Sequence, residues 1–176
     1  MPMQIIHSFE ISPQEYQQRG KDNQFPLVEC CPQCLYPQKL RKHGFYPRYA
    51  VFFYGHFHIP VLRLLCLSCK KTVSVLPDFL LPSFQHSLEF VLECLRSHYA
   101  GLRTGGCRQL VQFYRRRFNK NLNRLEAFFR DRGERGIIPG GKVKAIKLLE
   151  MIGAFPKAET FAKRFQDHFQ HNFMAN

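Results

Sequence analysis

Four cysteines are spaced as two pairs that could hold a metal ion. Cys31 and Cys34 form one CxxC pair, and Cys66 and Cys69 form a second pair after an insert of 31 residues. Two residues between the cysteines let a tight turn direct both sulfurs at one ion, and two such turns complete a tetrahedral zinc site. In a chain without a visible secretion signal, paired cysteines indicate metal binding rather than disulfides. The spacing therefore predicts one structural zinc ion held by these four thiolates.

The remaining three cysteines leave one alternative open. Cys30 could pair with Cys34 in place of Cys31, although Pro32 in the turn favours Cys31 as the ligand. Cys94 and Cys107 fall outside any metal-binding spacing, and we expect them to be small core residues.

A second group of possible metal ligands is the pair His56 and His58, separated by one phenylalanine. Residues two apart on a strand point to the same side, so both imidazoles could hold a catalytic metal in a single-strand nuclease. Such an enzyme also needs a tyrosine nucleophile on a nearby helix, and the spacing selects neither Tyr99 nor Tyr114. We interpret the two histidines as exposed or phosphate-contacting side chains. A metal-dependent nuclease stays the alternative.

The segment between the two cysteine pairs must be ordered, because both pairs have to meet at one ion. Residues 45–54 and 56–65 are rich in aromatic and β-branched residues, and Gly55 between them can make a turn. Polar and apolar residues alternate over residues 72–76, which predicts a third strand, and Pro77 ends this strand. These elements predict a small three-stranded zinc ribbon over residues 30–82. So small a fold needs the metal ion for its stability.

The chain that follows the ribbon has helical periodicity. Apolar residues predict a helix over about 86–99, and a second stripe runs from Leu110 to Phe118. Asn119 can cap a third helix that extends to about Arg130. Three short helices with a basic last one predict a helix-turn-helix-like unit over residues 83–135. The side chains expected to contact nucleic acid are Arg108, Arg115, Arg116, Arg117, Lys120, Asn121, Asn123 and Arg124. A basic face that only contacts solvent is the alternative.

A Gly- and Arg-rich linker is expected over residues 131–142. Beyond it, one apolar stripe runs from Val143 to Ile152 and another from Ala158 to Phe173. We expect the last face to pack in the core, with a homo-oligomer interface as the alternative. The predicted class is α+β, divided into an N-terminal segment 1–29, the ribbon 30–82, the helix-turn-helix-like unit 83–135 and a C-terminal helical extension 136–176.

The net charge of +13 indicates a polyanionic partner. Residues 1–29 are net −2, whereas residues 30–82 and 83–135 are each net +6. A protein with so positive an electrostatic field most commonly binds nucleic acid, and we expect double-stranded DNA as the partner. An adaptor whose basic surface meets protein or RNA is a second alternative. No apolar run is long enough to span a membrane and no secretion signal is visible, so we expect a cytoplasmic protein without a membrane partner.

Residues 30–82 resemble the zinc-ribbon segment of bacterial insertion-sequence transposases. The motifs that carry the resemblance are CPQC, then HGFYPR, then RLLCLSCKKTVSVLP. They are closer still to uncharacterised bacterial proteins that join such a ribbon to a helical DNA-binding unit. The resemblance implies zinc at Cys31, Cys34, Cys66 and Cys69, and a transposase-like or mobile-element-associated role with other element-encoded proteins as partners. Full transposases also carry a catalytic domain with three spaced carboxylates, for which this chain has no room, so we expect no enzymatic activity.

Overall fold

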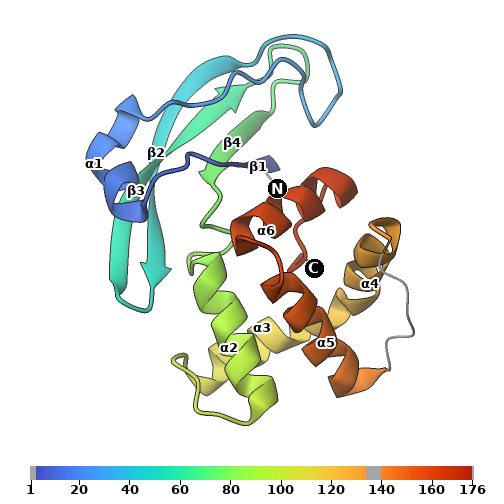
Figure 1. Ribbon diagram of the computed structural model, residues 1–176. Helices are drawn as coiled ribbons and strands as arrows, with labels where there is room; N and C mark the ends of the chain where they lie inside the picture. Colours follow the sequence, from blue (N-terminus) through green and yellow to red (C-terminus); the bar gives the residue numbers. More distant parts are fainter. Residues whose placement is uncertain (1–2, 134–139, 176) are drawn as a thin grey trace. The chain divides into compact units, whose positions relative to one another are not determined.

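The computed structural model describes residues 3–133 and 140–175. The chain divides into two compact units, Met1–Ser87 and Leu88–Asn176. Unit 1 holds a β-sheet and unit 2 holds helices, so the α+β class predicted from the sequence is confirmed (Figure 1). The finer division into four segments stays a prediction. No helix among the described residues is long and apolar enough to cross a membrane.

Unit 1 is built on a four-stranded mixed sheet. Strands β1 (Met3–His7), β2 (Arg41–Phe52), β3 (Gly55–Leu65) and β4 (Thr72–Pro77) lie in the order β1-β4-β3-β2. Strands β2, β3 and β4 pair in antiparallel fashion, and β1 pairs with β4 in parallel. The three strands expected from the sequence are present, whereas the sequence did not predict β1.

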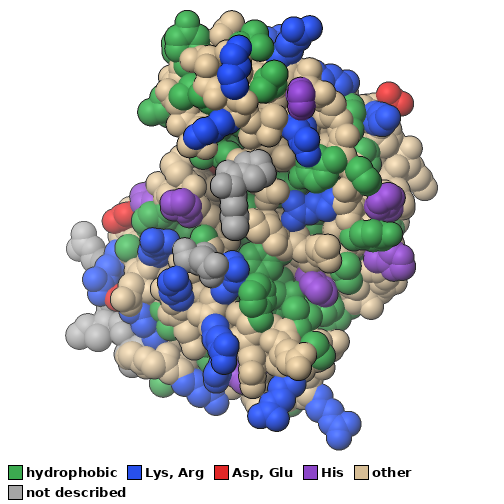
Figure 2. All heavy atoms as spheres, turned by 180° about the vertical axis from the view of Figure 1, so that it is seen from behind, with side chains coloured by type: hydrophobic (Ala, Val, Ile, Leu, Met, Phe, Trp, Pro, Cys, Tyr) green, Lys and Arg blue, Asp and Glu red, His purple; other side chains and the backbone are tan. Residues whose placement is uncertain are grey.

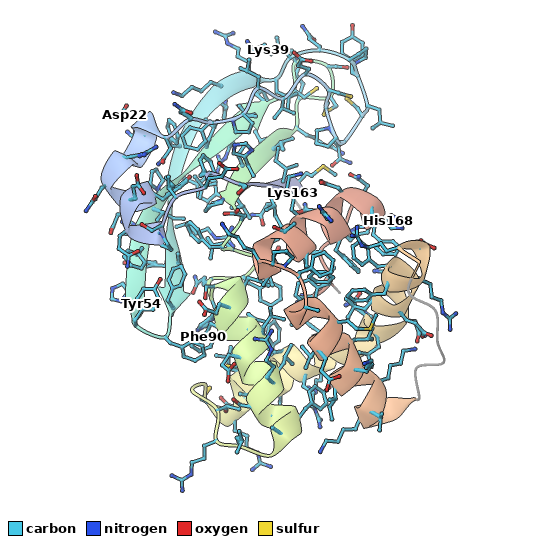
Figure 3. All side chains as sticks on the ribbon, viewed as in Figure 1. Asp22, Lys39, Tyr54, Phe90, Lys163 and His168 are labelled. Carbon is cyan, nitrogen blue, oxygen red and sulfur yellow. The ribbon has the colours of Figure 1, made fainter. Side chains whose placement is uncertain are left out.

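The turn between β2 and β3 comes just before Gly55, the residue at which the sequence predicts it. Phe52 pairs with Gly55, so Phe53 and Tyr54 form the turn. Tyr54 lies at the tip and is exposed (Figure 3). Gly55 is therefore the first residue of β3, where its φ of +148° is a conformation that favours glycine.

The two faces of this sheet carry separate apolar clusters. Consecutive strand residues point to opposite faces, so Val61 joins one cluster and Leu62 joins the other. The first face is covered by helix α1 (Pro13–Arg19), whose Tyr16 is fully buried. A 3₁₀ turn, η1 (Gly20–Asp22), follows this helix. The second cluster contains Cys31, which means that the packing of this face also positions a candidate metal ligand.

Unit 2 is helical, with a core rich in aromatic side chains. Phe129 and Phe161 stack with their ring centroids 5.9 Å apart, and both are buried. The described helices are α2 (Leu88–Ala100), α3 (Arg108–Lys120), α4 (Leu122–Asp131), α5 (Gly141–Gly153) and α6 (Ala158–Phe169). The helices expected over 86–99 and 110–118 therefore correspond to α2 and α3.

The third predicted helix begins later than expected. Asn119 lies inside α3 and does not cap α4, which begins at Leu122. The side-chain oxygen of Asn119 instead accepts a hydrogen bond from the Tyr99 hydroxyl. A partner from another helix thus fixes this asparagine, and the local sequence carries no sign of that contact.

The apolar face of α6 belongs to the core of unit 2. Phe161, Ala162 and Phe165 are buried there, so the core-packing interpretation of this face is confirmed. The predicted linker over residues 131–142 is described only at its ends, because residues 134–139 lie outside the described residues. The predicted boundary between residues 135 and 136 lies outside them as well.

Candidate metal centre and candidate nucleic-acid interface

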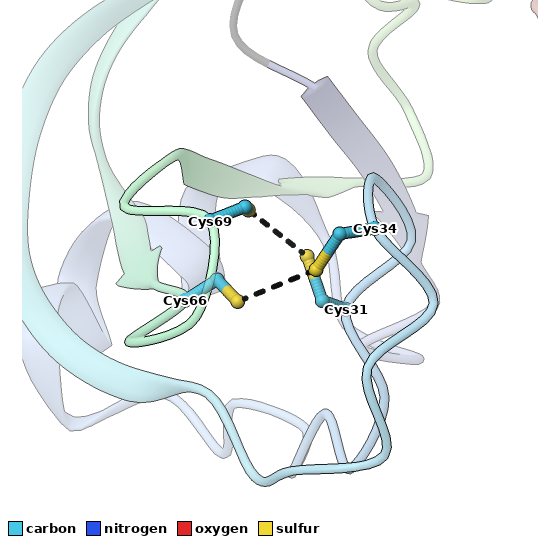
Figure 4. A group of neighbouring side chains, drawn as sticks. All are labelled: Cys31, Cys34, Cys66 and Cys69. Atoms are coloured by element: carbon cyan, nitrogen blue, oxygen red, sulfur yellow. Dashed lines mark hydrogen bonds between the residues drawn. The ribbon is translucent and has the colours of Figure 1, made fainter.

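The four cysteines predicted as ligands come together in unit 1 (Figure 4). Their sulfurs all lie within 4.8 Å of one another. The Sγ atoms of Cys31 and Cys69 are 3.8 Å apart, and those of Cys34 and Cys66 are 3.7 Å apart. Four Zn–S bonds of about 2.3 Å in a regular tetrahedron place the sulfurs about 3.8 Å apart. The group could therefore hold a metal ion, and zinc as its identity stays a prediction.

Each cysteine pair lies on its own turn, and the two turns have the same backbone geometry. The N–H of Leu35 donates to the carbonyl of Cys31 at 2.8 Å, and the N–H of Lys70 donates to the carbonyl of Cys66 at 3.0 Å. Leu35 and Lys70 have positive φ angles of 56° and 58°, a conformation that costs a non-glycine residue about 1 kcal/mol. Equivalent residues adopt it in both turns, so the same geometry directs each pair of sulfurs toward a common point.

Sequence reasoning did not identify Leu35 and Lys70 as part of the site. Each follows directly after the second cysteine of its pair, which is the only signal that could have found them. A strained backbone at two non-glycine positions is typical of a functional site whose surroundings maintain it.

Backbone N–H groups stabilise the thiolate form at this site. The pKa of the Cys66 thiol is lowered to about 7, chiefly because the N–H of Cys69 donates to its sulfur. The N–H of Lys71 favours the thiolate of Cys69 in the same way, but burial and the neighbouring sulfurs raise the pKa of that thiol to about 11. Four sulfurs this close repel one another as thiolates, so a divalent cation between them would stabilise all four.

The other three cysteines lie outside this group. Cys30 is exposed, whereas Cys31 is fully buried and belongs to the group, so the geometry favours Cys31 as the ligand. Cys94 is buried in unit 2, as expected of a core residue. Cys107 is exposed at the N-terminus of α3, so its prediction as a core residue is wrong.

His56 and His58 lie on β3 as the sequence predicts, and both are exposed. Tyr49 of β2 lies beside them, with ring centroids 6.0 Å from His56 and 4.9 Å from His58. Within residues 3–133 and 140–175, the two imidazoles belong to no group of three possible metal ligands. The described part of the chain therefore offers them no third ligand of the kind that a metal-dependent nuclease uses.

The predicted nucleic-acid contacts lie on α3 and α4 or between them. The exposed ones are Arg108, Arg116, Lys120, Asn123 and Arg124. Arg115 and Arg117 are half-buried. The guanidinium of Arg117 lies 4.6 Å from the Phe113 ring and donates to the Met174 carbonyl at 3.2 Å, so part of its role is structural.

Asn121 does not fit the predicted role of a base-contacting residue. Only 2% of it is exposed. Its side-chain N–H groups donate to the carbonyls of Arg117 at 2.9 Å and Ala175 at 2.8 Å. The first contact closes the end of α3, and the second holds the junction of α3 and α4 against the C-terminal segment. A buried amide with its donors already paired is not available to a base, so this assignment is corrected to a structural one.

Part of the chain matches a known protein family. Residues 31–106 match a family described as "Domain of unknown function (DUF6431)". The match covers less than half of the chain. It includes the four grouped cysteines and the strands β2, β3 and β4. No curated protein and no solved structure matches the chain. The family description names no activity.

Proposed function

We propose that this protein binds DNA, that a structural zinc ion holds its sheet-bearing unit together, and that it serves a mobile element without catalysing a reaction. The proposal is supported chiefly by the four-cysteine group, since zinc ribbons use such groups to complete a small fold. A site with four protein ligands leaves no coordination position for water or substrate, which is typical of structural rather than catalytic zinc.

The basic surface supports nucleic acid as the partner. Lys and Arg side chains are spread over the face drawn in Figure 2, with few acidic side chains between them. The chain carries a net charge of +13, and α3 and α4 present exposed cations such as Arg116, Lys120 and Arg124. Cations spaced along helices bind the phosphates of a duplex and release its counterions.

Helix α4 is the element proposed to read DNA sequence. A single residue separates α3 from α4, which is shorter than the turn of about three or four residues in a standard helix-turn-helix unit, so the proposed unit is only helix-turn-helix-like. Asn123 and Arg124 lie in the first turn of α4 and are exposed. Arginine and asparagine pair with guanine and adenine in the major groove, so these two side chains have suitable chemistry.

The proposal is tested by measuring the salt dependence of binding to duplex DNA and to RNA. Arg116→Ala should weaken binding to every duplex and lower the log–log salt slope by roughly one unit, because one phosphate contact is lost. Arg164→Ala is the matched control, since Arg164 is an exposed cation on α6. Equal losses in the two variants would contradict the assignment to α3 and α4. Tighter binding to RNA than to DNA would favour the adaptor instead.

A further inference from the structure

Unit 2 contains a cavity that the proposed DNA contacts do not explain. Its volume is about 500 Å³, and it lies where α2, α3 and the N-terminus of α5 meet. None of the described residues that line it is acidic, and three are basic or can become so. The lining residues are His98, Tyr99, Arg115, Asn119, Leu122, Gly141 and Lys142.

Arg115 lines this cavity, and one donor of its guanidinium is left without an acceptor by the described residues. Its Nε atom is buried and has no hydrogen-bond partner among them. A buried donor without a partner costs free energy, more so in a charged group. An anionic oxygen in the cavity would pair with the charge of the guanidinium that carries this donor.

The N-terminus of α5 adds backbone donors at the same place. The helix begins at Gly141 after Gly140, and no side chain in the described part of the chain caps it. Its first N–H groups have no intrahelical acceptor, and the helix dipole makes this end positive. Gly141 has a φ of +67°, and, its own chain neighbours aside, no atom of the described residues lies within 4 Å of the position where a Cβ would stand. Such ends of helices bind phosphate groups.

The positive charges at the cavity act on one another. The pKa of His98 is lowered, first by burial and then by the nearby charges of Arg115 and Lys142. Positive potential from α3 and α5 therefore converges on a side chain of α2. An anion bound between these groups would remove the repulsion, which favours anions over cations and neutral molecules.

We propose that this cavity binds a phosphate group, carried either by a free phosphorylated molecule or by a nucleic-acid backbone. In this arrangement Arg115 and Lys142 hold the phosphate oxygens, and the N–H groups at the start of α5 complete the site. The volume exceeds that of one phosphate and lies within the range of small-molecule sites, with Tyr99 and Leu122 available for an apolar part. The inference stands independently of sequence reading by α4. The sequence feature that corresponds to this site is Gly140-Gly141-Lys142. Its composition alone predicts a linker rather than a binding site.

The test compares two lysines on the same helix. Lys142 lines the cavity, whereas Lys147 lies farther along α5, is 57% exposed and pairs with Glu150 at 3.7 Å. Both side chains are exposed, so Lys142→Ala and Lys147→Ala should remain folded, which circular dichroism checks. Each protein is titrated by calorimetry with inorganic pyrophosphate and separately with duplex DNA.

We expect Lys142→Ala to bind pyrophosphate about tenfold or more weakly than wild type, and Lys147→Ala to bind it as wild type does. That result identifies a free phosphorylated molecule as the ligand. If pyrophosphate does not bind, but duplex affinity falls in Lys142→Ala alone, the ligand is a backbone phosphate. If the two variants behave alike with both probes, the cavity is not a phosphate site and the inference is overturned.

Discussion

Replacing Cys66 by serine should remove the metal and unfold one end of unit 1. Cys66 is buried and belongs both to the four-sulfur group and to the apolar cluster on the second face of the sheet. Serine is a much weaker zinc ligand than a thiolate, so the ion would keep three good ligands at most. The turns at residues 31–36 and 66–71 should open, while the cluster around Tyr16 on the other face stays packed.

The size of the effect follows from the ligand count. A structural zinc site contributes roughly 10–16 kcal/mol, so each of four thiolates supplies about 3 kcal/mol. Opening the turns also releases Leu35 and Lys70 from the left-handed conformation, but this release is the same in wild type and variant and cancels from their difference. The substitution should therefore favour the open state by about 3 kcal/mol, which corresponds to more than a hundredfold change in its population.

Native mass spectrometry and hydrogen exchange measure the two parts of this prediction. Wild type should carry one zinc ion per chain, and Cys66→Ser should carry almost none. The N–H groups of Leu35 and Lys70, which hydrogen bond within the turns, should exchange much faster in the variant. Cys30→Ser is the matched control, because Cys30 is exposed and outside the group. The reasoning is refuted if Cys66→Ser retains its metal, or if Cys30→Ser loses as much.

Two further predictions concern side chains outside the metal centre. The double replacement His56→Ala and His58→Ala should leave metal content and fold unchanged and weaken DNA binding by about 1 kcal/mol or less, as metal analysis and fluorescence anisotropy would show. Glu126→Gln should lower the free energy of unfolding at neutral pH by about 1 kcal/mol, measured by urea denaturation, because Lys144 hydrogen bonds to the Glu126 carboxylate and lowers its pKa. The ionised carboxylate stabilises the fold above its unfolded pKa of about 4.3, so the difference between wild type and variant should shrink as the pH falls below that value.

A different result would contradict each of these two predictions. Metal-dependent cleavage of single-stranded DNA that disappears in the double histidine variant would favour a nuclease over a binding protein. For the carboxylate, Glu150→Gln removes a charge that is 63% exposed and pairs with Lys147 at 3.7 Å. It should change stability little. An equally large loss in both glutamate variants, unchanged at acidic pH, would show that the Glu126 pair does not act through its charge.

The parts of the structure that sequence reasoning found are those with a local signal. The CxxC spacing depends on a few adjacent residues, and the structure brings Cys31, Cys34, Cys66 and Cys69 together. The stripe of apolar residues in α2 and the alternation in β4 are local in the same sense. A period of 3.6 or 2 can be seen in a short window, because it follows from backbone geometry alone.

The parts that were missed depend on contacts between distant segments. Asn121 resembles a base-contacting residue until Ala175, far along the chain, accepts its amide N–H. Strand β1 has only five residues, and its hydrogen-bonding partner is β4. The cavity likewise takes Tyr99, Arg115 and Lys142 from three different helices. Such pairings are decided by tertiary packing, which leaves no pattern in any single window of sequence.

The parallel pairing of β1 with β4 also determines the order in which the sheet can be completed during synthesis. Met3 lies opposite Val73, and Ile5 lies opposite Val75. The ribosome releases the N-terminus first, and contacts between residues so far apart require the closure of a long loop before they contribute stability. The hairpin of β2 and β3 can form from neighbouring residues, whereas β1 has no partner until Thr72–Pro77 has emerged. Among the four strands of this sheet, β1 therefore precedes the others in the chain but can join the sheet only with or after β4.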